Sequence, residues 1–457
     1  MIVCRSNRWD SNILGEIEET SIDALSTIFT ESQQCFVMRS SLSVRERIWF
    51  LYQFLALYKA HRSTIAEYIS LEIGKAIAHS LVDVDYDINY IERHLEYAEE
   101  ILAAETIYKD QHTQHIAYYE AIWVAAVISP WNYPSSQLVW QIIPPLLAGN
   151  TIIYKPASAC MWTAKCINDL LLNCLPHSVF QPIYGSSILW NELTKLPVDL
   201  IIFTGSTQVG QQIQHNAAQT MAQTHLELWW SAPGIILPDT LIDDAMMQTI
   251  DYFRIWHSGQ ICDGLKRLFV HHSQYHELVE KLQNYFSDMV IGNPLDPLTH
   301  MGMLISHDAK TYIQWLIDQS IAQGATKIEV WHYDGTPGPW MPVIFLMDVT
   351  LDMPVMTKEV FGPVLPIMTY DTIDEVITYA NTTIYGLWAY LRGQDKSQID
   401  YVCRRLHTGN ISVNNTSYLL PQVPFGWYTS ASGNFREHGR IGLRNYTIIK
   451  VISSSIL

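Results

Sequence analysis

The stretch that decides the fold class is residues 199–222, DLIIFTGSTQVGQQIQHNAAQTMA. Its apolar run at 199–203 predicts a buried strand, and residues 207–222 have the spacing of a helix. Between them lies the Gly-rich turn GSTQVG. Backbone N–H groups at the start of such a helix suit a pyrophosphate. GSTQVG is not the dinucleotide fingerprint GxGxxG, so the turn is a weak motif by itself. The stretch therefore predicts one strand–turn–helix unit of an α/β fold.

The same alternation continues on both sides of this unit. Further strands are expected at 122–128, 151–154, 181–184, 234–237, 266–271, 365–370 and 387–391, and further helices at 135–147, 160–174, 243–257, 275–287 and 373–381. Strands that alternate with helices form mostly parallel sheets covered by helices, so two α/β domains are expected. Residues 1–105 are expected to be mostly helical, and the tail 444–453 to be an exposed strand that could pair with another subunit.

Composition and charge exclude several classes of protein. The chain has 457 residues, of which 48% are hydrophobic and 16% charged, which excludes a disordered chain. Its formal charge of −17 argues against binding nucleic acid or anionic lipid. No apolar stretch approaches the roughly 20 residues that span a bilayer, and the N-terminus has no secretory pattern. The seven cysteines form no CxxC pair, so we expect neither a disulfide framework nor a metal site, and a cytoplasmic protein.

Three residues are candidates for chemistry. Cys262, in HSGQICDGLKR, could be a nucleophile, although a single cysteine is more often a small buried side chain. Glu227, in HLELWW, could be a general base whose pKa burial raises, or only a carboxylate at the end of a strand. Asn132 lies between the two prolines of PWNYP and could stabilise an oxyanion, or could simply be a turn residue.

The order of the motifs is more specific than any one of them. Along the chain they are PWNYP (130–134), LLAGNTIIYKPAS (146–158), FTGSTQVG (203–210), LEL (226–228), GQIC (259–262), EVFGPVLPI (359–367), YGL (385–387) and VPFG (423–426). In this order they resemble the aldehyde dehydrogenase superfamily, with wording similar to that of short bacterial enzymes of the succinate-semialdehyde type. The resemblance runs from about residue 115 to the C-terminus.

The resemblance implies an α/β fold with a Rossmann-like cofactor domain, an α/β catalytic domain and a small oligomerisation arm. The expected cofactor-binding domain comprises residues 1–106 and 122–226, and the catalytic domain residues 227–425. The arm is expected at 107–121 and 438–457, and it implies a homodimer or homotetramer. The implied activity is NAD- or NADP-dependent oxidation of an aldehyde to a carboxylate, with no nucleic acid or membrane as partner.

The resemblance also implies roles for individual residues. Cys262 matches the nucleophile, Asn132 the oxyanion donor and Glu227 the base that activates water. The residues implied for the cofactor are Trp131, Lys155, Ser158, Gly205, Ser206, Glu359 and Phe361. Ser158 stands where NAD-preferring relatives often carry Glu, and it does not repel a 2′-phosphate, so NADP is admitted beside NAD. Ser158 could instead be a helix N-cap.

The sequence departs from the family pattern mainly through tryptophan. The family's LELGGK reads LELWWS here, with Trp229, Trp230 and Ser231. An indole at Trp230 is expected to intrude on the nicotinamide, because Gly permits close approach of the backbone. Trp140 stands where semialdehyde-type relatives often carry Arg, which favours an apolar or aromatic aldehyde unless Trp140 is only a core residue. Two alternatives therefore stay open: a catalytically degenerate homologue with a binding or structural role, or a residual thiol esterase.

Overall fold

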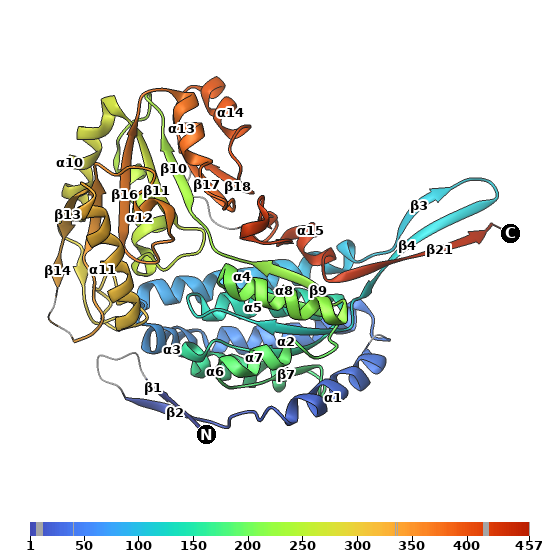
Figure 1. Cartoon of the computed structure of the whole chain (residues 1–457). Coiled ribbons are helices and arrows are strands. Elements are labelled where there is room, and N and C mark those ends of the chain that lie inside the picture. The colour runs from blue at the N-terminus through green and yellow to red at the C-terminus, as the bar shows by residue number, and fades with distance from the viewer. Residues whose placement is uncertain (6–11, 40, 334, 336, 415–419, 457) are drawn as a thin grey trace.

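The computed structural model describes residues 1–5, 12–39, 41–333, 335, 337–414 and 420–456. It contains two α/β layers, each a β-sheet with the helices that cover it, and a projecting arm (Figure 1). The first layer is a parallel sheet in the order β7-β6-β5-β8-β9. Its strands are β5 (Val124–Ile128), β6 (Thr151–Lys155), β7 (Phe180–Pro182), β8 (Leu200–Thr204) and β9 (Gln223–Glu227). These positions confirm the strands predicted around the 199–222 stretch, with ends that differ by a few residues.

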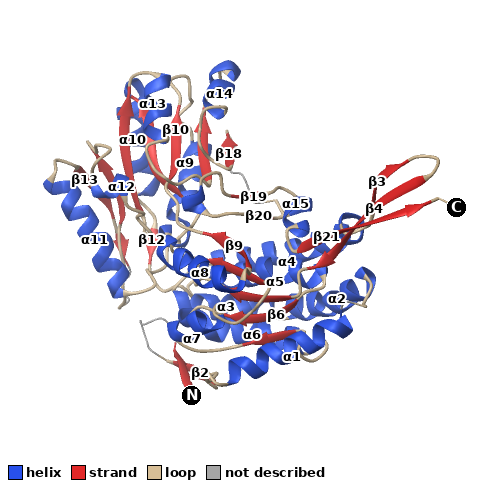
Figure 2. Ribbon diagram, turned by 45° about the vertical axis from the view of Figure 1, so that its right-hand side comes forward, coloured by secondary structure: helices blue, strands red, loops and turns tan. Residues whose placement is uncertain are grey.

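Both faces of this sheet are buried, which explains its continuous apolar runs. In β5, Ala125 and Val127 belong to one hydrophobic core, and Val124, Ala126 and Ile128 belong to the other. Alternate side chains of a strand point to opposite faces, so both sets must be apolar when helices cover both sides. The covering helices are α1 (Ala24–Arg39), α2 (Val44–Ala60), α3 (Arg62–Ile73), α4 (Ile77–Ile101), α5 (Pro134–Ala148), α6 (Met161–Leu172), α7 (Ser187–Leu193) and α8 (Thr207–Thr220). Figure 2 shows them around the sheet.

The second layer is a seven-stranded sheet in the order β13-β15-β16-β11-β10-β17-β18, parallel except for the β13–β15 pair. Its strands are β10 (Ala232–Ile236), β11 (Leu265–His271), β13 (Thr326–Val330), β15 (Val343–Met347), β16 (Val364–Tyr370), β17 (Trp388–Arg392) and β18 (Asn410–Val413). Its helices are α9 (Asp244–Ile250), α10 (Tyr275–Phe286), α11 (His307–Ala322), α12 (Pro354–Thr357), α13 (Ile373–Ala380) and α14 (Lys396–Cys403). The expected division into two α/β layers is confirmed; the residue numbers of the domain boundaries stay a prediction.

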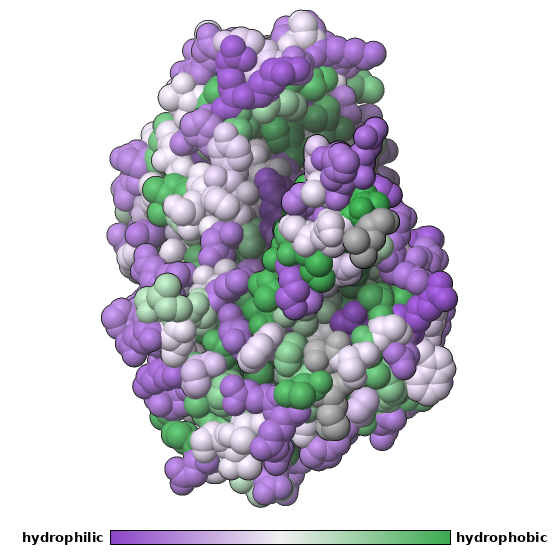
Figure 3. All heavy atoms as spheres, turned by 90° about the vertical axis from the view of Figure 1, so that its right-hand side faces the viewer, coloured by the Kyte–Doolittle hydropathy of each residue, from purple (hydrophilic) through white to green (hydrophobic). Residues whose placement is uncertain are grey.

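The arm is an antiparallel sheet in the order β21-β4-β3 that extends away from both layers (Figure 1). It consists of β3 (Glu105–Lys109), β4 (Thr113–Ala121) and β21 (Thr447–Ser455), and the short helix α15 (Gly439–Arg444) precedes β21. β21 lies at the edge of the arm. In Figure 3, which views the side on which the arm projects, apolar residues gather among polar ones in the middle of the face.

Residues 1–105 are mostly helical, as expected, although they begin with a hairpin of β1 (Ile2–Arg5) and β2 (Ile13–Ile17). Two other expectations need correction. The strand expected from residue 122 begins at Val124, because Trp123 has a φ of 125°, a conformation that suits glycine and interrupts a strand. The helix expected over 243–257 ends at Ile250 and continues as a π-helical turn to Ile255.

The chain then reverses into the loop that carries Cys262. His257, Ser258 and Gly259 have φ values of 52°, 54° and 70°, three left-handed residues in succession. A Cβ on Gly259 would lie 2.2 Å from the carbonyl oxygen of Gly362. This close approach packs the Cys262 loop against the EVFGP segment, and only glycine fits there. Among the described helices, none is long and apolar enough to cross a membrane.

Candidate active site

The candidate site lies at the carboxyl ends of the parallel strands of the first sheet. Asn132 follows β5, Lys155 ends β6, Gly205 follows β8 and Glu227 ends β9. The carboxyl ends of parallel strands meet at one edge of the sheet, which is where ligands bind in open α/β folds. The loop with Cys262 approaches this edge from the second layer, since the side chains of Asn132 and Cys262 line the same cavity.

Cys262 lies between two cavities. The larger is a cleft of about 630 Å³ between the two layers. Its wall includes Trp131, Asn132, Lys155, Gly205, Ser206, Trp229, Trp230, Cys262, Glu359 and Phe361. The smaller cavity, of about 80 Å³, lies on the other side of Cys262. The thiol therefore borders both a large cleft and a much smaller cavity.

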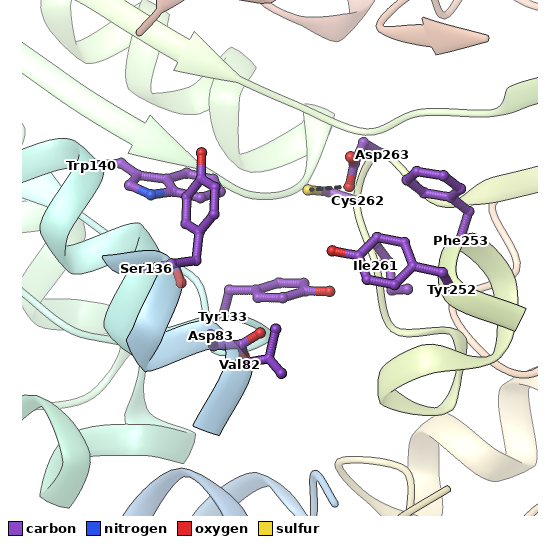
Figure 4. Close-up of a pocket in the computed structure, with 11 residues that line it drawn as sticks. Val82, Asp83, Tyr133, Ser136, Trp140, Tyr252, Phe253, Ile261, Cys262 and Asp263 are labelled. Carbon is purple, nitrogen blue, oxygen red and sulfur yellow. Dashed lines mark hydrogen bonds between the residues drawn. The ribbon is translucent and has the colours of Figure 1, made fainter. Parts of the chain in front are cut away.

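The smaller cavity is bordered mainly by aromatic rings (Figure 4). These rings belong to Tyr86, Tyr133, Trp140, Tyr252 and Phe253. The sulfur of Cys262 and the hydroxyls of Tyr133 and Tyr252 point into the space among them. Two carboxylates, Asp83 and Asp263, also line the cavity, and none of the described lining residues is Lys or Arg. Asp83 is paired with the buried ammonium of Lys75, which does not itself line the cavity, so the cavity is apolar and Asp263 is its remaining acidic group.

The Cys262 thiol is not activated in this arrangement. Its Sγ lies 3.9 Å from Oδ1 of Asp263, and burial together with the Asp263 charge raises its pKa well above the usual value. The nearby Lys266 ammonium acts in the opposite direction. Since the thiolate is the nucleophile, reaction requires a neighbouring positive charge and a proton acceptor that offset the effect of burial.

Asn132 is 5% exposed, and its Nδ2 donates a hydrogen bond of 3.1 Å to the carbonyl oxygen of Gln260. The Gln260 side chain accepts a hydrogen bond of 2.8 Å from the backbone N–H of Ile305. The amide of Asn132 is thus held next to the Cys262 loop by a residue that is itself fixed. A rigid amide donor beside a nucleophile has the character of an oxyanion donor.

Glu227 ends β9 with a side chain that is only 2% exposed. Neither carboxylate oxygen has a hydrogen-bond partner among the described residues, and the residue is not part of the wall of either cavity. Burial, with the nearby Glu437 carboxylate as a second cause, raises its pKa well above the usual value. Glu227 is close enough to act on the pKa of Cys262, but its carboxyl group lines neither cavity in this conformation.

The residues predicted to bind the cofactor are brought together with one exception. Six of them line the cleft: Trp131, Lys155, Gly205, Ser206, Glu359 and Phe361. Burial lowers the pKa of Lys155 to about 8, and its Nζ donates to the Pro156 carbonyl oxygen at 3.1 Å. The Oγ of Ser206 caps helix α8 by accepting from the Val209 N–H at 3.3 Å.

Ser158 is the exception. Its Oγ donates to the carbonyl oxygen of Gly185 at 3.4 Å, and the residue is not part of the cleft wall. Its role in cofactor binding stays a prediction, but the N-cap alternative is wrong, because Ser158 is the first residue of a 3₁₀ turn whose N-cap is Ala157. The side chain is satisfied by a neighbouring loop, which local sequence does not reveal.

The tryptophans line the cleft and leave it open. Trp230 is 3% exposed and belongs to a core of the second layer, whereas Trp229 is 43% exposed. Elsewhere, the Nε1 of Trp388 donates to Ser412 Oγ at 2.8 Å, so this indole is accommodated with its polar atom satisfied. Trp140 is 5% exposed and forms part of the smaller cavity.

Two basic residues follow Cys262 in the sequence, and they have different surroundings. Arg267 is structural, since its guanidinium donates to the carbonyl oxygens of Ser231 and Ala380 at 3.0 Å. Lys266 is 2% exposed, and its Nζ lies 3.4 Å from Oε1 of Glu359 on the cleft wall. The cavity residues Asp83 and Tyr86 on α4 were missed, because an amphipathic helix gives no signal for which buried residue meets a cavity.

Comparison with known proteins agrees with this geometry. Residues 3–452 match the aldehyde dehydrogenase family. The chain is 30% identical over 455 residues to the succinate-semialdehyde dehydrogenase [NADP(+)] GabD of Escherichia coli, covering 97% of this chain and 92% of the relative. The succinate-semialdehyde dehydrogenase structure from Burkholderia pseudomallei superposes with a TM-score of 0.95 at 26% identity, covering 100% and 94% of the two chains. Betaine aldehyde dehydrogenase from Staphylococcus aureus in complex with NAD+ superposes with a TM-score of 0.93 at 26% identity, covering 99% and 91%.

The match spans nearly the whole chain, and the fold has the same parallel cofactor sheet and mixed catalytic sheet as these structures. The chain therefore belongs to the aldehyde dehydrogenase family, the enzymes that oxidise aldehydes with NAD or NADP.

Proposed function

We propose that Cys262 attacks the carbonyl carbon of an aldehyde that enters through the smaller cavity, in an oxidation that uses NAD or NADP bound in the cleft. The observation that carries this proposal is that Cys262 lies between the two cavities. A nucleophile in that position can contact a substrate on one side and face a cofactor on the other. The attack forms a thiohemiacetal, and its oxyanion accepts a hydrogen bond from Nδ2 of Asn132.

The described residues fit a dinucleotide. Oε1 of Glu359 is buried on the cleft wall with the Lys266 ammonium 3.4 Å away and with no hydrogen bond among the described residues, so it can still accept from a ribose hydroxyl. Ser206 at the start of α8 suits a pyrophosphate, and Lys155 a ribose. When bound, NAD or NADP would accept the hydride whose loss converts the thiohemiacetal to a thioester. Trp131 and Phe361, whose rings lie 5.7 Å apart, border the same space and exclude water from it.

Glu227 is proposed to remove the proton from the water that hydrolyses the thioester. This step breaks the bond between sulfur and the acyl carbon, releases a carboxylate and returns the proton to the thiol. The high pKa of the Glu227 carboxyl makes its carboxylate a strong base once it ionises. Its side chain must turn toward the cleft for this step, because it lines neither cavity in this conformation.

The smaller cavity favours an aldehyde with an uncharged apolar or aromatic tail. Its rings suit such a tail, and the Asp263 carboxylate disfavours an anionic one, whereas the charge of Asp83 is paired with Lys75. Burial raises the pKa of Asp263 to about 6, so this carboxyl is still largely ionised at pH 7. We therefore expect a higher kcat/KM for benzaldehyde than for succinic semialdehyde.

A direct experiment is to replace Cys262 by Ala and to measure formation of NADH or NADPH with benzaldehyde. Cys262→Ala should abolish the activity. Cys403→Ala, in a half-buried cysteine on α14, is the matched control and should retain it. Activity in the Cys262 variant would refute the proposal, and ester hydrolysis without aldehyde oxidation in the unmodified protein would favour the thiol esterase.

The wider setting of the enzyme is also proposed. We infer a cytoplasmic homodimer or homotetramer in which pairs of subunits associate through the arm. We also infer that the cofactor-binding domain comprises residues 1–106 and 122–226. The exposed edge strand β21 supports the assembly, because an unpaired apolar edge is a site for pairing with another strand. Among the described residues, no group of three or more His, Cys, Asp and Glu side chains could hold a metal ion.

A further inference from the structure

Lys266 is a buried cation that joins the Cys262 loop to the wall of the cleft. Its side chain is 2% exposed. Its Nζ donates a hydrogen bond of 2.6 Å to the carbonyl oxygen of Ile261, the residue before Cys262. The same Nζ lies 3.4 Å from Oε1 of Glu359 and 4.6 Å from the centre of the Phe361 ring. One ammonium group therefore contacts the nucleophile loop and both of the EVFGP residues that line the cleft.

Arg254 fixes the other side of this arrangement. Its Nε donates to the carbonyl oxygen of Val364 at 2.7 Å, and its Nη2 donates to that of Val360 at 3.1 Å. These bonds hold the backbone on both sides of Phe361. The backbone N–H of Trp230 also favours the charged form of the Glu359 carboxylate. Glu359 is thus placed as the counterion of Lys266.

A buried ammonium without a partner loses its proton, because the interior disfavours the charged form. Burial lowers the pKa of Lys266 to about 8, and the Glu359 carboxylate opposes this effect. The ion pair therefore keeps Lys266 charged near neutral pH. The hydrogen bond from this ammonium to the carbonyl oxygen of Ile261 holds the positive charge beside the Cys262 loop.

We propose that Lys266 is a positioning residue that holds the Cys262 loop and supplies the positive charge that stabilises the Cys262 thiolate. The proposal rests on the proposed function of Cys262 as the nucleophile. Activation of a cysteine by a neighbouring cation is a general device of reactive thiols. Here the cation is fixed at the carbonyl of residue 261 and is kept charged by Glu359.

The other ionisable groups around the thiol cannot take this role. Asp263 and Glu227 are carboxyl groups and disfavour the thiolate when they are ionised. Tyr133 and Tyr390 also face Cys262, and burial raises the pKa of both phenols well above the usual value. These phenols stay neutral over the range in which a thiol titrates. Among the charged side chains of the described residues that act on Cys262, Lys266 is the one that favours the thiolate.

The test is the pH dependence of Cys262 alkylation in the protein without cofactor. Iodoacetamide reacts with the thiolate, and mass spectrometry of the peptide that contains Cys262 follows the rate. We expect Lys266→Met to shift the midpoint of the rate profile to higher pH by about one unit or more, which is a tenfold slower reaction below the midpoint. Lys266→Arg keeps the charge and should stay close to the unmodified protein.

Two further variants make the result decisive. Lys266→Met leaves the Glu359 carboxylate unpaired, so the double variant Lys266→Met/Glu359→Gln removes both buried charges and should show the same upward shift. Lys155→Met removes another lysine of the same cleft and should leave the Cys262 profile unchanged. An unchanged profile in folded Lys266→Met would overturn the proposal, and so would an equal shift in Lys266→Arg. Alkylation needs neither an aldehyde nor turnover of the cofactor. A negative result in this test can therefore be told apart from failure of the proposed function, which would appear as activity that survives in Cys262→Ala.

Discussion

The side-chain amide of Asn132 donates a hydrogen bond of 3.1 Å to the carbonyl oxygen of Gln260, two residues before Cys262. The proposed oxyanion donor is thus already fixed against the loop of the proposed nucleophile. In the reaction this N–H must exchange its backbone partner for the developing oxyanion, which is the stronger acceptor because it is charged. Preorganisation of this kind lowers the cost of reorienting dipoles as the charge forms.

Asn132→Ala should therefore lower kcat/KM for aldehyde oxidation by about 10²–10³, the usual effect of removing one oxyanion donor. The steady-state rate of NADH or NADPH formation measures this effect. Alkylation of Cys262 is the control, because the variant removes the donor and leaves the thiol in place. A kcat/KM within about threefold of the unmodified protein would show that another group binds the oxyanion.

Glu227→Gln should preserve the first turnover and slow those that follow. A glutamine cannot accept the proton of the hydrolytic water, so the thioester accumulates and turnover falls by about 10²–10⁴. Stopped-flow measurement should then show a burst of reduced cofactor followed by a slow steady state. If the burst itself disappears, Glu227 acts before hydrolysis, for example in removing the proton of Cys262.

The pH dependence of turnover offers a second measure of Glu227. Burial and the Glu437 carboxyl raise the pKa of Glu227, so the carboxyl group is protonated at low pH and unable to act as a base. Turnover limited by hydrolysis should rise with pH as this group ionises, and the rise should be absent in Glu227→Gln. An identical pH profile in both proteins would assign the dependence to another group.

How much of this site the sequence predicts depends on how local the cause is. The strands of the first sheet are predictable because both faces of the sheet are buried, so that strands such as β5 and β8 are uninterrupted apolar runs in the sequence. Asn132, Cys262 and Glu359 are found because each lies in a short motif. The order of those motifs also identifies the family, although each alone is weak.

The errors have tertiary causes. The helix expected to reach residue 257 ends early, because close packing of Gly259 on Gly362 forces the left-handed residues before it. The orientation of Glu227 and the pairing of Lys266 with Glu359 join segments that are distant in the chain. Periodicity carries no record of such contacts. The N-cap alternative for Ser158 is wrong for the same reason, since the partner of its hydroxyl lies in the loop at Gly185.

Buried carboxyl groups should make the stability of the fold fall as pH rises through neutrality. Glu437 is 2% exposed, and burial raises its pKa from 4.5 to about 8. Between these values the unfolded chain has released a proton that the folded chain keeps. The free energy of unfolding then decreases with pH, by about 1.4 kcal/mol per unit for one such group. Asp87 and Glu72, whose pKa values burial raises to about 7, act in the same direction.

Glu437→Gln isolates one of these contributions. Between about pH 5.5 and 7.5 the denaturant-derived free energy of unfolding should fall less steeply in the variant than in the unmodified protein, by about 1.4 kcal/mol per pH unit. Glu375→Gln is the control, because hydrogen bonds lower the pKa of this half-buried residue and it stays ionised in both states. Equal slopes in the Glu437 variant and the unmodified protein would contradict the prediction.

The arm should hold two copies of the chain together. Ile449 and Val451 on β21 are 64% and 54% exposed, and the strand lies at the edge of its sheet. Because they lie on one face of the strand, Ile449→Lys/Val451→Lys should place two charges in the interface and release monomers of 52.4 kDa in sedimentation velocity. Ile188→Lys, at another exposed isoleucine on α7, should leave the assembly intact. A stable monomer of the unmodified protein at micromolar concentration would refute an arm-mediated dimer.

Substitutions of Trp229 and Trp230 test whether these indoles line the cleft or block the nicotinamide site. Trp230 is 3% exposed in the core of the second layer, so Trp230→Ala should lower the free energy of unfolding by about 3–5 kcal/mol through the cavity that it leaves. Trp229 is 43% exposed, and Trp229→Ala should cost about 1 kcal/mol or less. Denaturant unfolding measures both.

Cofactor binding then decides what Trp230 does in the cleft. If its indole occupied the volume that the nicotinamide needs, Trp230→Gly would bind NAD or NADP more tightly than the unmodified protein does. The cleft keeps about 630 Å³ with both indoles on its wall, so we expect equal or weaker binding in the variant.

Titration with NAD and NADP, followed by tryptophan fluorescence, measures the affinities. Trp229→Phe should lose much of the quenching that the bound cofactor causes, because Trp229 is the more exposed indole of the cleft wall. Turnover of an aldehyde at about 1–10³ per second by the unmodified protein would agree with this result, because an enzyme whose nicotinamide site is blocked cannot reach such rates. Tighter binding in Trp230→Gly, together with slow turnover of the unmodified protein, would instead favour the degenerate homologue.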